Sequence, residues 1–264
     1  MTQRWFITGV ASGIGRALCD AILARGDVVV GTARRPEEAR SFDERGNNAH
    51  GLVLDLDHHE MVAGVVAQAV ELAGGPIDIV VNNAGRSLWA SVEETPLDQA
   101  KALFSTNVFG PMAVMQAFLP LFRERGQGTF VNMSSGCGLF GVPGVGAYCG
   151  TKFALEGLSE TVALEAASFG VKVMLVEPGA VRTRFISHGT TEVGTPGGHY
   201  GYVDHGKHVL DGYYDEKAIR PEALAAEILA ALDSGNTPSR LVVGEDTRPG
   251  ARAKFQALAD MLAD

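Results

Sequence analysis

The stretch "TGVASGIG", residues 8–15, lies between the apolar run "RWFIT" (4–8) and the helical pattern "RALCDAILARG" (16–26). Gly9 permits a tight turn, Gly13 lets backbone N–H groups approach a pyrophosphate, and Gly15 lets the helix pack close to the strand. The spacing is G-x-x-x-G-x-G rather than G-x-G-x-x-G, so an alternative is a plain strand-to-helix turn. Its place between a strand and a helix favours a dinucleotide-binding turn.

Further apolar runs follow along the chain: "DVVVGTA" (27–33), "GLVLDL" (51–56), "IDIVVNN" (77–83), "GTFVNMS" (128–134), "VKVMLVEP" (171–178) and "RLVVG" (240–244). Helical patterns separate most of them, which predicts parallel strands joined by right-handed crossovers. The runs are continuously apolar, as in strands covered on both faces. We therefore predict one doubly wound Rossmann-type α/β domain spanning residues 1–264, with about seven parallel strands and helices on both faces.

A Gly, His and Tyr-rich insertion at about residues 185–217 breaks this rhythm. Insertions of this length in compact domains are usually lids or disordered. Four histidines crowd it: His188, His199, His205 and His208. No carboxylate or cysteine completes a ligand set at familiar spacing, so no metal site is predicted.

The formal net charge of -9, with no clustered basic segment, argues against nucleic acid as a partner. The cysteines Cys19, Cys137 and Cys149 lack C-x-x-C spacing, which predicts neither a disulfide framework nor a zinc knuckle. A reducing, cytoplasmic location fits them best. The first residues enter a β-like run at once, so no signal peptide is expected. The apolar segment "VFGPMAVMQAFLPLF" (108–122) is too short to span a bilayer and holds two prolines, so no membrane partner is expected.

The second strand ends in "VVVGTARRPEEA" (28–39), where the cofactor's ribose would be bound. Ala33 occupies the position at which an acid would bind a free ribose 2′-hydroxyl. Arg34 and Arg35 follow, and a guanidinium suits a 2′-phosphate, which predicts NADP(H) as the cofactor. The alternative is that both arginines are solvated and pair with Glu37 and Glu38.

Five ordered motifs carry a family resemblance: "TGVASGIG", "NNAG" (82–85), "MSS" (133–135), "YCGTK" (148–152) and "EPGAVRT" (177–183). Together they resemble the short-chain dehydrogenase/reductases of the common type, over nearly the whole chain. Each motif alone is weak, but each lies at a strand's carboxyl end, where open α/β sheets bind ligands. The resemblance implies an NAD(P)-dependent oxidoreductase.

Carried over by position, the resemblance assigns the catalytic group to Asn107, Ser135, Tyr148 and Lys152. Tyr148 and Lys152 share a helix face at i and i+4. A free phenol has a pKa near 10, and a neighbouring ammonium lowers it toward the working range. Tyr148 would exchange a proton with the substrate oxygen, which Ser135 would hold. Lys152 would also bind the nicotinamide ribose, and Asn107 would anchor a water that links Lys152 to solvent.

The resemblance also implies the cofactor contacts, which run from the glycine turn to the sixth strand. Asp55 and Leu56 would hold the adenine, and residues 83–85 would line its ribose. Thr183 would lie near the carboxamide or the pyrophosphate. The full predicted set is Gly9, Ser12, Gly13, Ile14, Gly15, Arg34, Arg35, Asp55, Leu56, Asn83, Ala84, Gly85, Tyr148, Lys152, Pro178, Gly179, Val181 and Thr183. Asn82 and Asn83 could equally tie the strand end to neighbouring backbone.

Other residues near these motifs have simpler interpretations. Ser134 should point to the opposite strand face from Ser135. A serine hydrolase is disfavoured because "MSSGCG" lacks the G-x-S-x-G elbow. Cys137 and Cys149 are interpreted as packing residues, because no base is identified for either thiol. His58 and His59 should cap or solvate a helix start.

The residues expected to face the substrate are mostly apolar: Leu88, Trp89, Gly136, Cys137, Val142, Pro143 and Phe185. Such a pocket selects by shape and desolvation, which favours an uncharged ketone or aldehyde and its alcohol. Arg86 and Arg182 are the possible exceptions. An alternative is that Leu88 and Trp89 pack only against the insertion.

The sequence thus predicts an NADP-dependent oxidoreductase that interconverts a carbonyl compound and its alcohol. A second hypothesis is a non-catalytic NADP-binding sensor or scaffold with the same fold. A sugar-nucleotide epimerase or dehydratase is disfavoured, because no substrate domain is present. Wide apolar helix stripes, together with the resemblance, predict a homodimer or homotetramer.

Overall fold

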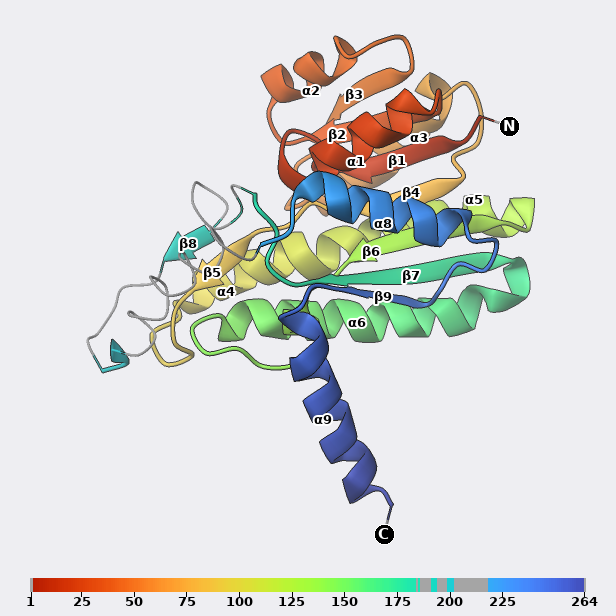
Figure 1. The fold of residues 1–264 in the computed structure, drawn as a ribbon. Coiled ribbons are helices and arrows are strands. Elements are labelled where there is room, and N and C mark those ends of the chain that lie inside the picture. Colours follow the sequence, from red (N-terminus) through yellow and green to blue (C-terminus); the bar gives the residue numbers. More distant parts are fainter. Residues whose placement is uncertain (1, 184, 186–190, 194–198, 202–217, 264) are drawn as a thin grey trace.

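A seven-stranded sheet forms the centre of the protein (Figure 1). The computed structural model describes residues 2–183, 185, 191–193, 199–201 and 218–263. The sheet strands are β1 (Arg4–Thr8), β2 (Val28–Ala33), β3 (Ala49–Val53), β4 (Ile79–Asn82), β6 (Gly128–Met133), β7 (Val171–Pro178) and β9 (Arg240–Val243). Each corresponds to one of the predicted apolar runs.

The sheet order is β3-β2-β1-β4-β6-β7-β9, and every pairing is parallel. The chain moves outward from β1 to β3, then returns to β4 and continues to the other edge. The order therefore reverses between β1 and β4, and ligands of doubly wound sheets bind at the carboxyl ends near such a reversal. The predicted fold class is confirmed.

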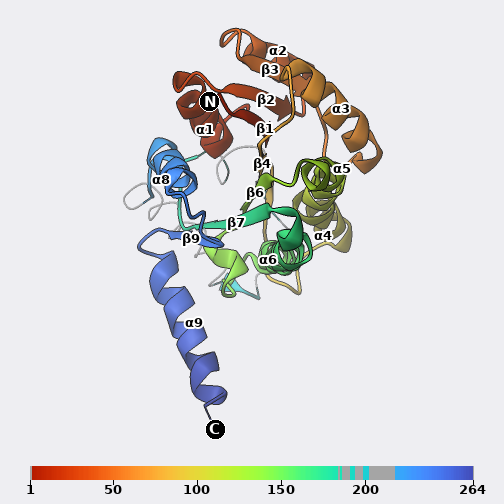
Figure 2. The same ribbon diagram turned by 90° about the vertical axis from the view of Figure 1, so that its right-hand side faces the viewer.

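Helices cover both faces of the sheet, with α1 and α8 on one face and α3, α5 and α6 on the other (Figure 2). The helices are α1 (Gly13–Ala24), α2 (Pro36–Asp43), α3 (Val62–Leu72), α4 (Leu97–Phe104), α5 (Gly110–Arg125), α6 (Gly146–Ala166), α8 (Pro221–Asp233) and α9 (Thr247–Met261). Short segments are the 3-10 turns η1 (His59–Met61), η3 (Gly136–Gly138) and η4 (Ala167–Phe169), and the π-helical η2 (Ser105–Phe109).

The two helical layers explain why the strands are continuously apolar. In β1, Trp5 and Ile7 belong to the core under α1 and α8, while Phe6 belongs to the core under α3 and α5. Successive side chains of a strand point to opposite faces, so a strand covered on both faces needs apolar residues at every position.

The helix that carries Asn107 extends beyond the apolar segment 108–122 at both ends. The segments α4, η2 and α5 form one continuous helix over Leu97–Arg125, which is long and apolar enough to span a membrane by length and composition. Core helices of soluble proteins meet the same criterion, and α5 buries Val114, Phe118 and Phe122 in the core beneath the sheet. Pro111 does not end the helix. It lies directly after the π-helical η2, where the backbone hydrogen-bond pattern of the helix changes.

A second, two-stranded sheet pairs β5 (Ser87–Trp89) with β8 (Thr191–Val193), and the sequence pattern did not predict it. Most of the predicted insertion, including His188, His205 and His208, lies outside the described residues. That residues 1–264 form one domain stays a prediction.

The helix α9 leaves the body of the protein and projects beyond α6 in both views (Figures 1 and 2). Its first residue, Thr247, is buried, whereas Phe255, Leu258 and Met261 farther along are exposed. The helix therefore starts inside the protein and ends with apolar side chains in solvent.

Candidate active site

A cavity of about 680 Å³ opens at the carboxyl ends of the central strands. Its walls include Gly9 after β1, Asn83 after β4, Ser135 after β6 and Pro178 at the end of β7. The cavity thus lies beside the point where the strand order reverses, and parallel strands bring all these strand ends to one edge of the sheet.

The glycine turn is shaped by close contacts that larger residues would break. Gly9 has a φ of 76°, and a Cβ on it would lie 2.9 Å from the Ala84 Cα. A Cβ on Gly13, whose φ is 58°, would lie 3.2 Å from Thr183 Cγ2, and one on Gly15 would lie 2.3 Å from the Gly9 oxygen. The turn is therefore held against the "NNAG" loop and against Thr183.

The start of α1 has the properties of an anion site. No acidic residue lies in the first turn of α1, and Ser12, its N-cap, makes no side-chain capping hydrogen bond. The first N–H groups of a helix lack partners within the helix, and the helix dipole is positive at that end. Because Ser12, Gly13 and Ile14 also line the cavity, this turn fits the pyrophosphate of a dinucleotide.

The structure brings most of the predicted cofactor residues together. Those that line the cavity are Gly9, Ser12, Gly13, Ile14, Arg34, Asp55, Leu56, Asn83, Ala84, Gly85, Tyr148, Lys152, Pro178, Gly179, Val181 and Thr183. Gly15 and Arg35 do not line it. Gly15 is buried behind the turn, while Arg35 pairs with Glu38 at 2.5 Å and Glu37 at 3.4 Å. The predicted pairing with Glu37 and Glu38 is thus observed for Arg35, while Arg34 is exposed at the cavity.

The two asparagines of "NNAG" hold the strand ends in place. Asn83 Nδ2 donates to the main-chain oxygens of Thr8 at 2.8 Å and Gly9 at 3.0 Å. Asn82 Nδ2 donates to Asn132 Oδ1 at 2.8 Å in the buried sheet. Asn83 also lines the cavity, so both of its predicted roles are compatible with the structure.

Tyr148 and Lys152 lie one turn apart on α6, and both are buried at the cavity. Lys152 Nζ lies 5.6 Å from the centroid of the Tyr148 ring and donates to the Met133 carbonyl at 2.7 Å. Burial lowers the pKa of Lys152 from 10.5 to about 8, because a charged ammonium loses its water. Cys137 and Glu156 oppose this shift.

Ser135 begins the turn η3, with its Oγ accepting a hydrogen bond from the Cys137 N–H at 3.2 Å. Cys137 lines the cavity, as expected for a residue that faces the substrate. Its thiol is hydrogen-bonded to that of Cys149, which raises the pKa of Cys137 and lowers that of Cys149 to about 7. The serine and its neighbours are thus linked to the start of α6.

Asn107 lies in the π-helical η2, beside the cavity but not on its surface. Its Oδ1 accepts from the Arg86 N–H at 2.9 Å, and its Nδ2 donates to the Arg86 carbonyl at 2.8 Å and to Thr151 Oγ1 at 3.2 Å. A Cβ on Gly85 would lie 3.2 Å from Asn107 Oδ1 and 3.9 Å from Lys152 Nζ. Asn107 therefore holds the loop that passes Lys152.

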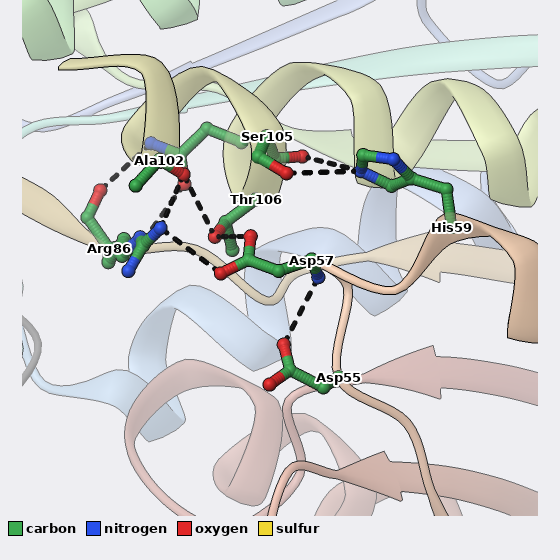
Figure 3. A network of polar contacts seen from close by, with 8 residues as sticks. Asp55, Asp57, His59, Arg86, Ala102, Ser105 and Thr106 are labelled. Atoms are coloured by element: carbon green, nitrogen blue, oxygen red, sulfur yellow. Dashed lines mark hydrogen bonds and ion pairs between the residues drawn. The ribbon is translucent and has the colours of Figure 1, made fainter. Parts of the chain in front are cut away.

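A polar network that the sequence did not reveal ties this loop to the predicted adenine site (Figure 3). Arg86 Nη2 donates to Asp57 Oδ2 at 3.2 Å and to the Ala102 carbonyl, and Thr106 Oγ1 donates to Asp57 Oδ1 at 2.7 Å. The Asp57 N–H in turn donates to Asp55 Oδ1 at 3.1 Å. The Arg86 guanidinium is thus engaged by the protein, and Arg86 also lines the cavity.

His59 extends this network instead of capping a helix with its side chain. Its Nε2 lies 3.2 Å from the Ser105 carbonyl and 3.3 Å from Ser105 Oγ (Figure 3). The ring also packs edge-on against Phe109. Both contacts brace the η2 segment.

The substrate side of the cavity has apolar walls made by Trp89, Phe140, Val142, Val145 and Phe185. The Phe185 ring lies 5.9 Å from the Tyr148 ring, centroid to centroid.

Two of the residues expected in these walls lie elsewhere. The expectation for Leu88 is wrong, because alternate residues of β5 point to opposite sides: Ser87 and Trp89 line the cavity while Leu88 is buried. Pro143 is also absent from the wall.

Two further wall residues, Asp246 and Thr247, come from the start of α9. Asp246 Oδ2 accepts from the Ala180 N–H at 2.9 Å, and a Cβ on Gly136 would lie 2.8 Å from Thr247 Oγ1. No sequence motif marks these residues, because their role depends on the fold bringing the end of the chain to the "EPG" loop.

Comparison with known proteins agrees with this geometry. Residues 3–192 match the family model of short chain dehydrogenase. Oxidoreductase BOA17 of Botryotinia fuckeliana is 33% identical over 93% of this chain and 90% of its own length. The 3-ketodihydrosphingosine reductase of Bacteroides thetaiotaomicron is 32% identical over 90% of this chain and 86% of its own.

Solved structures agree as well. A short-chain dehydrogenase from Streptomyces avermitilis superposes with a TM-score of 0.90 at 37% identity, covering 99% of this chain and 94% of that one. ElxO with NADP bound superposes with a TM-score of 0.76 at 27% identity, covering 92% and 97%. The chain belongs to the short-chain dehydrogenase family, as an NAD(P)-dependent oxidoreductase. Its cofactor is therefore a nicotinamide dinucleotide.

Proposed function

We propose that this protein interconverts an uncharged ketone or aldehyde and its alcohol, with NADP(H) as cofactor and Tyr148 as general acid/base. The observation that carries the proposal is the position of Tyr148 and Lys152, buried one helical turn apart in the cavity that the glycine turn also lines. When bound, the nicotinamide supplies or accepts the hydride.

The chain's own residues bind the substrate oxygen and move the proton. Ser135 donates a hydrogen bond to the carbonyl oxygen. Tyr148 gives that oxygen a proton during reduction and takes it back during oxidation. The Lys152 ammonium favours the phenolate form of Tyr148, because opposite charges attract strongly in a site shielded from water.

Asn107 supports the site by holding the loop beside Lys152. Both N–H groups of its amide are used, by Arg86 and Thr151, and its Oδ1 accepts one hydrogen bond. An amide oxygen has two lone pairs, so Oδ1 retains one for the water that the family resemblance implies.

Replacing Tyr148 by Phe tests the chemistry. The variant keeps the ring that packs near Phe185 and removes the hydroxyl, so turnover of a ketone found in a panel should be lost while NADPH still binds. Unchanged turnover would rule out Tyr148 as the acid/base. NADPH binding without turnover of any carbonyl compound by the wild-type protein would favour the sensor hypothesis.

The preference for NADP over NAD is supported by the position of Arg34. It lines the cavity next to Ala33, which stands where an acid would bind a free 2′-hydroxyl, and Glu38 of α2 also lines the cavity there. NADPH should bind more tightly than NADH in a fluorescence titration. Arg34→Ser should remove most of the difference and Arg35→Ser little of it; equal affinities in the wild-type protein would refute the preference.

The substrate class is supported by the apolar wall and by the engagement of Arg86 with Asp57. The relative from Bacteroides thetaiotaomicron is named for reduction of a ketone, which supports the carbonyl part of the proposal. A panel of ketones, aldehydes and alcohols, followed by NADPH absorbance, tests this. Preferred turnover of carboxylated or phosphorylated ketones would contradict it.

We also propose a homodimer or homotetramer in the cytoplasm. The assembly is supported by the exposed apolar residues Phe255, Leu258 and Met261 on the projecting α9. Light scattering coupled to size-exclusion chromatography measures it, and a monomer at micromolar concentration would refute it. The location rests on the cysteine content described above.

A further inference from the structure

The helix α6 carries four titratable side chains at steps of four residues: Tyr148, Lys152, Glu156 and Glu160. Four residues overshoot one helical turn by about 40°, so such a row winds slowly around the helix. Tyr148, Lys152 and Glu156 are buried, whereas the Glu160 side chain is 60% exposed. The row therefore leads from the reaction site to the protein surface.

Glu156 is the member that the proposed reaction leaves unexplained. Its Oε2 accepts from Arg240 Nη1 at 2.7 Å, its Oε1 is buried, and its carboxyl group is hydrogen-bonded to that of Glu177 when Glu177 is protonated. Burying a carboxylate is costly even when it is paired, so an apolar residue at this position would be the cheaper choice for stability alone.

The Oε1 atom of Glu156 lies on the side of the strand end that carries Ser134 and Ser135. A Cβ on Gly138 would lie 3.0 Å from Glu156 Oε1 and 2.5 Å from Ser134 Oγ. Ser134 follows Met133, whose carbonyl binds Lys152 Nζ. Glu156 thus faces the same short segment that holds the lysine.

Arg240 on β9 forms ion pairs with Glu156, Glu160 and Glu177. Glu177 is fully buried on β7, and burial, with Glu156 nearby, raises its pKa to about 7. Below that pH Glu177 is mostly neutral. The cluster then holds two cations, Lys152 and Arg240, against the two carboxylates of Glu156 and Glu160.

We propose that Glu156 is a positioning residue for the carbonyl reaction, whose carboxylate, fixed by Arg240, keeps Lys152 protonated inside its water-excluded site. The inference rests on the proposed function, because a protonated Lys152 is what makes Tyr148 an effective acid/base. The titratable and charged groups around Glu156 are Lys152 and Glu160 on α6, Glu177 on β7 and Arg240 on β9. The thiol of Cys137 is a further titratable neighbour of Lys152.

Two measurements on the full-length protein test the proposal. The first is the pH dependence of kcat/KM with a ketone substrate. The second needs no turnover: trace acetic anhydride labels unprotonated lysines across a pH series, and peptide mass spectrometry gives the titration midpoint of Lys152. Glu156→Gln should move both the midpoint and the alkaline limit of activity toward acid by about 1 pH unit, as expected when an opposite charge is removed nearby.

The chain offers a matched control in Glu160→Gln. Glu160 contacts the same arginine but lies in solvent, so its loss should leave both measurements unchanged. Glu156→Asp keeps the carboxylate but moves it away from Lys152 by one methylene, so it should shift the Lys152 midpoint by less than Glu156→Gln does. This variant keeps the test available if Glu156→Gln does not fold.

An unchanged Lys152 midpoint in Glu156→Gln or Glu156→Asp would overturn the inference, even if activity or melting temperature fell. Equal shifts in Glu160→Gln would also overturn it, because the effect would then be a general loss of charge. A shifted midpoint in a protein that turns over no carbonyl compound would support the link between Glu156 and Lys152 while refuting the proposed reaction.

Discussion

Lys152 should lower the stability of the folded protein at neutral pH, and Lys152→Met measures by how much. Burial lowers the pKa of this lysine from 10.5 to about 8. The ammonium is therefore less favourable in the folded protein than in the unfolded chain. Methionine retains much of the side chain's length and shape without the charge, so the variant should unfold less readily at pH 7 even though it loses the proposed catalytic lysine.

The size of the effect follows from the pKa difference. A shift of one unit corresponds to 1.36 kcal/mol, so lowering the pKa from 10.5 to about 8 gives about 3 kcal/mol. The variant also loses the hydrogen bond from the charged Lys152 to the Met133 carbonyl, which costs about 1.5–3 kcal/mol. The net gain at pH 7 is at most about 1.5 kcal/mol, or up to roughly 6 °C in Tm for a chain of this size.

The pH dependence gives a sharper test than the value at one pH. Between about pH 8 and 10.5 the unfolded chain binds more protons at this lysine than the folded protein does. The stability of the wild-type protein therefore rises with pH relative to the variant in that window. The advantage of Lys152→Met should be complete below pH 8 and should fade toward pH 10.5.

Urea unfolding of both proteins at several values from pH 7 to pH 10 measures this difference, and other titrating groups cancel because both chains share them. Lys172→Met is the control, because Lys172 is exposed on β7 and its loss should leave the difference near zero at every pH. A Lys152→Met variant that is less stable at pH 7, with a difference that does not vary with pH, would refute the reasoning.

Further predictions concern the turn, the core and the polar network. Gly15→Ala places a Cβ 2.3 Å from a main-chain oxygen of the turn and should weaken NADPH binding by at least about tenfold in a titration. Gly157→Ala, in open space on α6, should not weaken it, and equal NADPH affinities of the Gly15→Ala variant and the wild-type protein would contradict the prediction. Phe122→Ala removes a fully buried ring and should cost about 3–5 kcal/mol in urea unfolding, and a loss below 1 kcal/mol would show that the core is looser than described. Thr106→Val removes the hydrogen bond to Asp57 and should lower kcat by about tenfold, with Thr106→Ser retaining activity; matching rates for Val and Ser would argue against a role for the hydroxyl.

The seven sheet strands were predictable because their signal is local. A strand buried on both faces needs apolar residues at every position, and Trp5, Phe6 and Ile7 satisfy this without reference to the rest of the chain. The pair β5 and β8 was not predictable, because a three-residue strand carries too little pattern and its partner is about a hundred residues away in the sequence.

The candidate site divides in the same way. The glycine turn and the Tyr148–Lys152 pair are visible as motifs, since a turn conformation and a helix face depend on short spacings. The contact between Asp57 and Arg86, the role of Thr247 and the inward burial of Leu88 have no such spacing. The sequence offered two interpretations for Arg34 and Arg35, as cofactor ligands or as partners of Glu37 and Glu38. Only the fold separated the two arginines, because it pairs Arg35 with both glutamates.

By itself, the sequence determined the strand pattern and the glycine turn, because backbone geometry and residue chemistry act over a few positions. It proposed Ser135, Tyr148 and Lys152 as site residues through the family resemblance. Tertiary structure alone decided that Arg240 binds Glu156, one helical turn from Lys152 on α6. Those two residues are 84 positions apart in the sequence. Their contact exists only because α6 packs against β7 and β9 pairs with the edge of β7 opposite to β6. The burial that lowers the pKa of Lys152 depends on the same packing, since water is excluded by the whole fold and not by any one segment.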